Sequence, residues 1–177
     1  MINEVIKKNG ITYGVIAGIV SVLITTIIYS TDVKLFTAWW ISVISIGLYI
    51  SIAIILLVKT KKEINTIFSF KDAFTTYFIY AVISLIITVI FNIILFNFID
   101  PSLKETIKEL TLKYMAEMMQ KMNAPAAKIN EALQKIKEGD QFSISGLLKG
   151  SASNLVVSSI FGLILAAFFK SKTTTQE

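Results

Sequence analysis

Residues 73–99, AFTTYFIYAVISLIITVIFNIILFNFI, contain no charged side chain over a length that can cross a lipid bilayer. A helix needs about 20 consecutive apolar residues to span the hydrocarbon core, which is roughly 30 Å thick. Its backbone N–H and C=O groups are then paired within the helix, as a medium without water requires. This stretch therefore predicts a membrane-spanning helix, and its neighbours decide how many such helices the chain contains.

Three further stretches have the same character, and 54% of the chain is hydrophobic. They lie at about residues 10–30, 37–58 and 147–169, and Lys149 interrupts the last one early. A lysine near the end of a span can extend its amine to the membrane surface. We therefore predict an all-α fold, a four-helix transmembrane bundle with three helices in residues 1–99 and a fourth helix and tail in residues 147–177.

The segment between the third and fourth spans, residues 100–146, is charged and differs from the rest of the chain. Pro101 ends the third span, because proline removes a backbone donor and restricts the residue before it. Ser102 is then placed to cap a new helix, and Pro125 suits the first turn of another. We predict an extramembrane helical hairpin with helices at about 102–122 and 125–138.

Each predicted helix of the hairpin has an apolar stripe at three- or four-residue spacing. The first stripe comprises Leu103, Ile107, Leu110, Tyr114, Met118 and Met122. The stripes can pack on each other, on the bundle or on the membrane surface. The alternative is a surface that binds a partner, because methionine side chains adapt to varied ligands. The candidate residues are Tyr114, Met115, Met118, Met119 and Met122, and a copper site is a further alternative for the methionines.

The spans also carry small residues at four-residue spacing, which let helices in a bilayer approach closely. The packing candidates are Gly10, Gly14 and Gly18 in the first span and Asn154, Ser158 and Gly162 in the last. The glycine series predicts packing inside the monomer, with a homodimer face as the alternative. Asn92 in the third span and Asn154 are predicted to lie at one depth and share a hydrogen bond worth about 1 kcal/mol. A polar pore lining is the alternative for these two residues.

Several chemistries lack their usual residues in this sequence. The chain has no Cys and no His, so the commonest metal ligands and the commonest general base are missing. No nucleotide-binding glycine loop or hydrolase motif is present, and no span carries a buried carboxylate of the kind that ion-coupled transport uses. We expect no catalytic residue, no cofactor and no metal site. The net charge of +5 comes from lysines that flank spans or alternate with carboxylates, so we expect no nucleic-acid partner.

The lysines also predict the orientation. Lys7 and Lys8 precede the first span, further lysines follow the second, and the tail is basic too. Positive residues remain on the cytoplasmic side, and those beside the first span usually dominate. We therefore expect both termini in the cytoplasm and residues 100–146 outside it.

The order of these parts resembles a family of small Bacteroidota membrane proteins known as domain of unknown function 4199. The resemblance rests on a lysine tail running into YGVIAG, a Trp-bearing start of the second span, FSFKDAF before the third span, and a long helical insert before the last one. It implies a bacterial inner-membrane location and no known activity. We expect a non-enzymatic protein that acts in assembly or partner binding, with the lipid bilayer and a protein partner or self-association through residues 102–138 as its contacts. A small transporter or channel component with a Ser/Thr/Asn-lined interior is the alternative.

Overall fold

The computed structural model describes residues 2–171, and these residues are almost entirely helical. The long helices are α1 (Glu4–Thr31), α2 (Trp39–Glu63), α3 (Phe70–Ile94) and α6 (Ile144–Phe169), while α4 (Leu103–Lys121) and α5 (Ala126–Glu138) form the insert. A 3-10 turn (Val33–Thr37) joins α1 to α2, and a π-helical turn (Leu95–Ile99) extends α3. No strand occurs within the described residues, so the predicted all-α class is confirmed.

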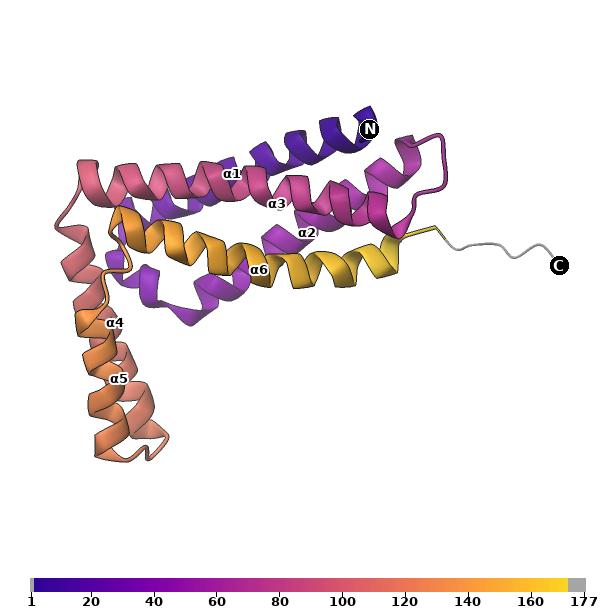
Figure 1. Ribbon diagram of the computed structural model, residues 1–177. Helices are drawn as coiled ribbons and strands as arrows, with labels where there is room; N and C mark the ends of the chain where they lie inside the picture. Colours follow the sequence, from indigo (N-terminus) through magenta and orange to yellow (C-terminus); the bar gives the residue numbers. More distant parts are fainter. Residues whose placement is uncertain (1, 172–177) are drawn as a thin grey trace.

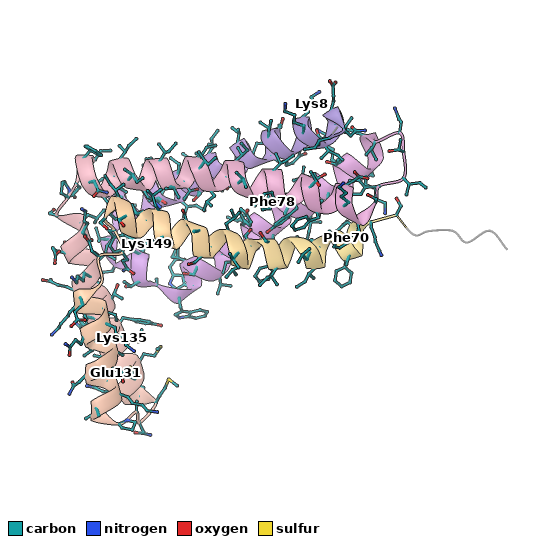
Figure 2. The ribbon with its side chains drawn as sticks, in the orientation of Figure 1. Lys8, Phe70, Phe78, Glu131, Lys135 and Lys149 are labelled. Atoms are coloured by element: carbon teal, nitrogen blue, oxygen red, sulfur yellow. The ribbon has the colours of Figure 1, made fainter. Side chains whose placement is uncertain are left out.

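The four long helices lie side by side as a bundle, and each is long and apolar enough to cross a membrane (Figure 1). The chain is therefore a membrane protein. α1 and α6 begin and end near the same end of the bundle, which we call the terminal end. The α4–α5 hairpin leaves the opposite end, the hairpin end, and runs crosswise to the long helices (Figure 1). Figure 2 shows Lys8 near the terminal end and Lys149 near the hairpin end, so charged side chains mark both ends of the apolar bundle.

Local sequence signals set several of the helix starts. Ser69 and Asp72 form a complete capping box before α3, because the Ser69 Oγ accepts from the Asp72 N–H at 3.1 Å and the Asp72 carboxylate accepts from the Ser69 N–H at 3.1 Å. Ser143 caps α6 by accepting from the Gly146 N–H at 3.0 Å.

The predicted serine cap of α4 is wrong. Ser102 has a helical backbone and makes no capping bond with its side chain. Asp100 does this work instead, because its carboxylate accepts from the backbone N–H groups of Ser102, at 3.2 Å, and Leu103, at 3.3 Å. A carboxylate is both a better acceptor than a hydroxyl and a negative charge at the positive end of the helix.

The tightest seam in the bundle joins α1 to α3. A Cβ atom added at Gly10, Gly14 or Gly18 would lie 2.8 Å from the side chain of Ile79, Ile83 or Ile87, respectively. That approach is closer than real Cβ atoms make, so only glycine fits. The glycine series therefore contacts α3 of the same chain rather than being exposed. Gly162 in α6 similarly packs against the ring of Tyr77.

The main core fills the terminal half of the bundle. Ala53, Leu56 and Leu57 from α2 are fully buried there together with Phe68 and Tyr80. Asn9 is buried beside them and donates from its amide to Thr60 at 3.2 Å and to Glu63 at 2.8 Å. This half of the bundle is close-packed, whereas the hairpin half of α2, residues 39–50, has no buried residue.

The predicted hydrogen bond between Asn92 and Asn154 is absent. The Asn92 carbonyl oxygen is buried without a partner, and Asn154 is exposed. The antiparallel register of α3 and α6 explains the difference, because the Tyr77 hydroxyl meets Ser158 at 3.0 Å. Counted from that pair, Asn154 lies level with about residue 81 of α3, roughly 16 Å along the helix from Asn92 at 1.5 Å per residue. The sequence alone placed both residues by distance from the predicted span ends, and the helices do not end level.

Candidate functional site

The base of the α4–α5 hairpin is fixed to the hairpin end of the bundle. Leu103 and Ile107 are each only 3% exposed and form a small core with Leu95 and Phe96. The surrounding side chains come from α1, the 3-10 turn, α3 and the segment before α6, namely Tyr29, Val33, Phe36, Phe91 and Phe142. Because this core draws on several parts of the chain, it holds the start of α4 in one direction.

Polar groups reinforce the same junction. The Tyr29 hydroxyl donates to the Asp100 carboxylate at 3.3 Å, and the Ser102 hydroxyl donates to it at 2.5 Å. The Ser102 bond is the largest of several effects that hold the pKa of Asp100 below its usual value. Asn97 donates from its amide to the Phe142 carbonyl at 3.3 Å and accepts from the Lys104 amine at 2.8 Å. These bonds join both ends of the insert to α3.

Ile107 marks the face of α4 that is turned toward the bundle, and residues further along α4 can be assigned to the same face. An α-helix turns about 100° per residue, so positions seven and eleven residues further on return to within about 20° of the same face. Tyr114 and Met118 therefore face the side on which Ile107 meets the bundle. They are 39% and 37% exposed, and Met122 at the end of the helix is 73% exposed. We call Tyr114, Met118 and Met122 the overhanging stripe, because the far part of the hairpin extends beyond the bundle (Figure 1).

The other methionines have a different environment. Met115 and Met119 are half-buried, and α5 is the neighbour of this part of α4. The α5 residues with apolar side chains, Ile129, Ala132, Leu133 and Ile136, are half-buried as well. The predicted apolar stripe includes Met118 and Met122 but neither Met115 nor Met119, and packing and partner binding were both open for it. The structure instead divides the methionines, with Met115 and Met119 partly covered and Met118 and Met122 exposed.

The turn between the two helices is defined by its backbone conformation and hydrogen bonds. Asn123 has φ of 54°, the left-handed conformation that asparagine tolerates at helix ends. Its N–H donates to the Gln120 carbonyl at 2.9 Å, and the Ala124 N–H donates to the Met119 carbonyl at 3.0 Å. Pro125 follows directly and precedes the first residue of α5. The predicted end of the first helix, at about residue 122, agrees with this geometry.

Charged groups lie on the outer surface of the hairpin. Glu131 and Lys135 are neighbours on α5, and their side chains form an ion pair at 2.7 Å (Figure 2). The hydrogen bond and the charge of Lys135 lower the pKa of Glu131, and Glu131 raises the pKa of Lys135 for the same reasons. Both side chains are well solvated, so the pair contributes little stability. Among residues 2–171, no group of three or more acidic, histidine or cysteine side chains is placed to hold a metal ion.

The predicted site residues therefore lie in two separate regions. Gly10, Gly14, Gly18, Ser158 and Gly162 are at helix contacts inside the bundle. Tyr114, Met115, Met118, Met119 and Met122 lie on the hairpin, where only three of them form an exposed surface. Asn92 and Asn154 belong to neither seam. Tyr77, Tyr80 and Tyr49, which meet in the middle of the bundle, were not singled out from the sequence.

Comparison with known proteins adds one match. A family model described as "Protein of unknown function (DUF4199)" matches residues 12–171. No curated protein and no solved structure matches the chain.

Proposed function

Because the chain belongs to the family of proteins of unknown function DUF4199, its role must be inferred from its own surfaces, and we propose that it is a non-enzymatic assembly or partner-binding protein of the membrane. Its working surface is the overhanging stripe of the hairpin. The residues that catalysis most often uses, His and Cys, do not occur in the chain. We therefore propose a binding role and no enzymatic one.

A single observation carries this proposal, namely the direction of the stripe. Leu103 and Ile107 pack against the end of the bundle, so Tyr114 and Met118 on the same face of α4 face the membrane beside the bundle. Tyrosine is enriched where membrane meets water, because its ring is apolar and its hydroxyl is polar. Methionine side chains are flexible enough to fit an irregular apolar surface. The bilayer surface is thus the occupant that these residues suit best.

The location follows from the lysine pattern and the family resemblance. We propose that the protein resides in a bacterial inner membrane with both termini in the cytoplasm and residues 100–146 outside. Trp39 and Trp40 lie at the hairpin end and are 67% and 44% exposed, as expected for side chains at a membrane boundary. The hairpin then lies on the outer face of that membrane.

Photocrosslinking in living cells tests this proposal. A photoreactive amino acid replaces Met118 in one variant and Gln134, on the exposed surface of α5, in a matched control. We expect phospholipid adducts on the hairpin peptide from position 118, and few from position 134, because only the stripe faces the bilayer. The adducts are identified by mass spectrometry of the peptide.

Two outcomes contradict the assignment of the bilayer surface as the occupant of the stripe. Equal lipid labelling from positions 118 and 134 shows that the stripe has no preferred contact with the membrane. Labelling of position 118 by a protein alone, whether a second copy or another membrane protein, assigns the surface to a protein partner and removes the lipid as its occupant.

A further inference from the structure

A second feature of the bundle is a cavity in its hairpin half. The residues of α2 that are buried, Ala53, Leu56, Leu57 and Thr60, all lie toward the terminal end. Toward the hairpin end α2 diverges from α6 (Figure 1). The space between α2 and the other three long helices is a cavity of about 460 Å³ with an apolar lining in the main. We call this cavity the pouch, and it is separate from the overhanging stripe.

Tyrosines close the pouch toward the terminal end. The rings of Tyr49 and Tyr80 lie 4.7 Å apart, and the Tyr80 hydroxyl donates to the Tyr49 carbonyl at 2.7 Å. Tyr77 is held beside them by its 3.0 Å contact with Ser158. Beyond these rings the core around Leu56 and Leu57 is fully buried. The pouch therefore ends in the middle of the bundle, which is the geometry of a binding site and not of a continuous pore.

The polar groups of the pouch are all uncharged. Asp, Glu and Lys do not occur among its lining residues, which include the hydroxyls of Ser45, Ser84 and Thr88 and the amide of Asn154. Ser84 lines the pouch and is only 4% exposed. The Asn154 amide also lines the pouch, and the antiparallel register brings it within about one helical turn of Ser84. Hydroxyl and amide groups in a mostly apolar cavity favour an occupant that can hydrogen-bond to them.

These observations restrict the chemistry of the occupant. Binding sites for small molecules have volumes of about 300–1,000 Å³, mostly apolar walls and a few polar groups that orient the ligand. A charged group in the pouch would be desolvated without a counter-charge, at a high cost in free energy. We propose that the pouch binds the uncharged part of one membrane amphiphile, with its chain between α2 and α6 and a hydroxyl or carbonyl oxygen against Ser84 and Asn154.

Two sources could supply this chemistry, namely the chain and ester region of a membrane phospholipid or a free neutral amphiphile. The test uses the full chain in phosphatidylcholine nanodiscs and a photoreactive derivative of hexadecanol as the probe. We expect labelling of α2 and α6 peptides that line the pouch. Unlabelled hexadecanol should displace the probe, and palmitate, which has the same chain and a carboxylate, should displace it poorly.

Two substitutions on one helix provide a matched pair. Ser45 lines the pouch from α2, whereas a side chain added at Gly47 meets nothing within 4 Å. Ser45→Phe should fill the pouch and lower labelling at least about tenfold, while Gly47→Phe adds similar bulk and should leave labelling unchanged. Ser84→Ala keeps the shape and should weaken the competition by hexadecanol about three- to tenfold through the lost hydrogen bond. It also serves as the decisive variant if Ser45→Phe fails to fold.

The results of these experiments distinguish the two possible sources of the occupant. Displacement of the probe by hexadecanol at constant phospholipid identifies a free neutral amphiphile. Loss of labelling in step with added phosphatidylcholine, relative to an inert detergent, identifies the phospholipid chain itself, and both results support an uncharged chain and oxygen in the pouch. Equal labelling of Ser45→Phe and Gly47→Phe, no effect of Ser84→Ala, or displacement by palmitate as strong as by hexadecanol overturns the proposal.

Discussion

Glycines in this chain have opposite environments in α1 and α2. Gly14 in α1 leaves no room for a Cβ atom, since Ile83 and the Tyr80 carbonyl lie 2.8 and 2.9 Å from its ideal position. Gly47 in α2 has open space around that position. Helices in a bilayer associate through close packing and not through the hydrophobic effect, so this difference should be visible in the stability of the bundle.

Substitution of the two glycines by valine tests that difference. We expect Gly14→Val to lower the free energy of unfolding by about 1–3 kcal/mol, because the added atoms push α1 away from α3. Gly47→Val should change it by less than about 0.5 kcal/mol, since valine replaces glycine in an exposed helix with a small gain in propensity. Unfolding of the purified protein in increasing SDS, followed by circular dichroism, measures both. Equal losses of stability in the two variants contradict the assignment of the α1–α3 seam.

Asp100 is the second residue whose role can be tested alone. Hydrogen bonds from Ser102, Leu103 and Tyr29 lower the pKa of its carboxyl group. A lowered pKa means that its contribution to stability is present above the ordinary Asp pKa of about 4 and is lost as the pH falls through the lower value in the folded protein. We expect a spin label at Gln120 to become more mobile at pH 3 than at pH 6. Asp100→Asn should remove most of that pH dependence, and an unchanged response in this variant argues against the assignment.

α4 is one helix with two different halves. Its first half is held by the small core at the hairpin end, where Ile107 is 3% exposed, and its second half presents the overhanging stripe. The sequence pattern is the same throughout, because apolar residues recur at three- or four-residue steps in both halves. Only the neighbours differ, and they come from α1, the 3-10 turn and α3.

Alanine substitutions in the two halves should separate anchoring from surface contact. Ile107→Ala removes buried methyl groups and should cost about 2–4 kcal/mol, with faster proteolysis of the hairpin. Met118→Ala, at a side chain that is 37% exposed, should cost less than about 1 kcal/mol in detergent. Proteolysis rates and SDS unfolding of both variants provide the comparison. A hairpin that is cleaved no faster in Ile107→Ala than in the native chain contradicts the anchoring role of the core.

At the scale of the whole molecule, the sequence predicted the spans well and their arrangement poorly. Long uncharged stretches identify α1, α2, α3 and α6, because a bilayer leaves few alternatives for such segments. The capping box before α3 and the turn at Asn123 were equally local and equally predictable. α1 begins at Glu4, earlier than the apolar run suggested, since its first turn is polar.

Features that depend on several helices at once could not be predicted. The crosswise direction of the hairpin depends on Asp100 and on a core drawn from distant segments. The depth of Asn154 in the bundle depends on the register of α3 and α6, which is set by the contacts of Tyr77 with Ser158 and Gly162. Residue spacing within one helix does not predict such a register. The pouch exists because α2 packs through one half only, and its residues look similar in both halves. In each case the prediction requires contacts between segments that are distant in the sequence.

The orientation of the whole bundle is a further prediction. The chain has no cysteine, so Gln120→Cys in the hairpin introduces a single reactive thiol. We expect a membrane-impermeant maleimide to label it in intact cells, because residues 100–146 are proposed to lie outside the cytoplasm. Lys8→Cys near the terminal end should react only after the membrane is permeabilised. The reverse pattern contradicts the proposed orientation.

The central claim is that the hairpin lies on the membrane with Met118 turned toward lipid. Trp39 and Trp40 are first replaced by phenylalanine, and a single tryptophan is then placed at Met118 or, as the control, at Gln134. The variants are reconstituted in vesicles that contain phosphatidylcholine brominated near the headgroup or deep in the chain, and tryptophan fluorescence is measured. We expect strong quenching of position 118 by the shallow bromine, weaker quenching by the deep one, and little quenching of position 134 by either. Weak and equal quenching at the two positions contradicts the central claim.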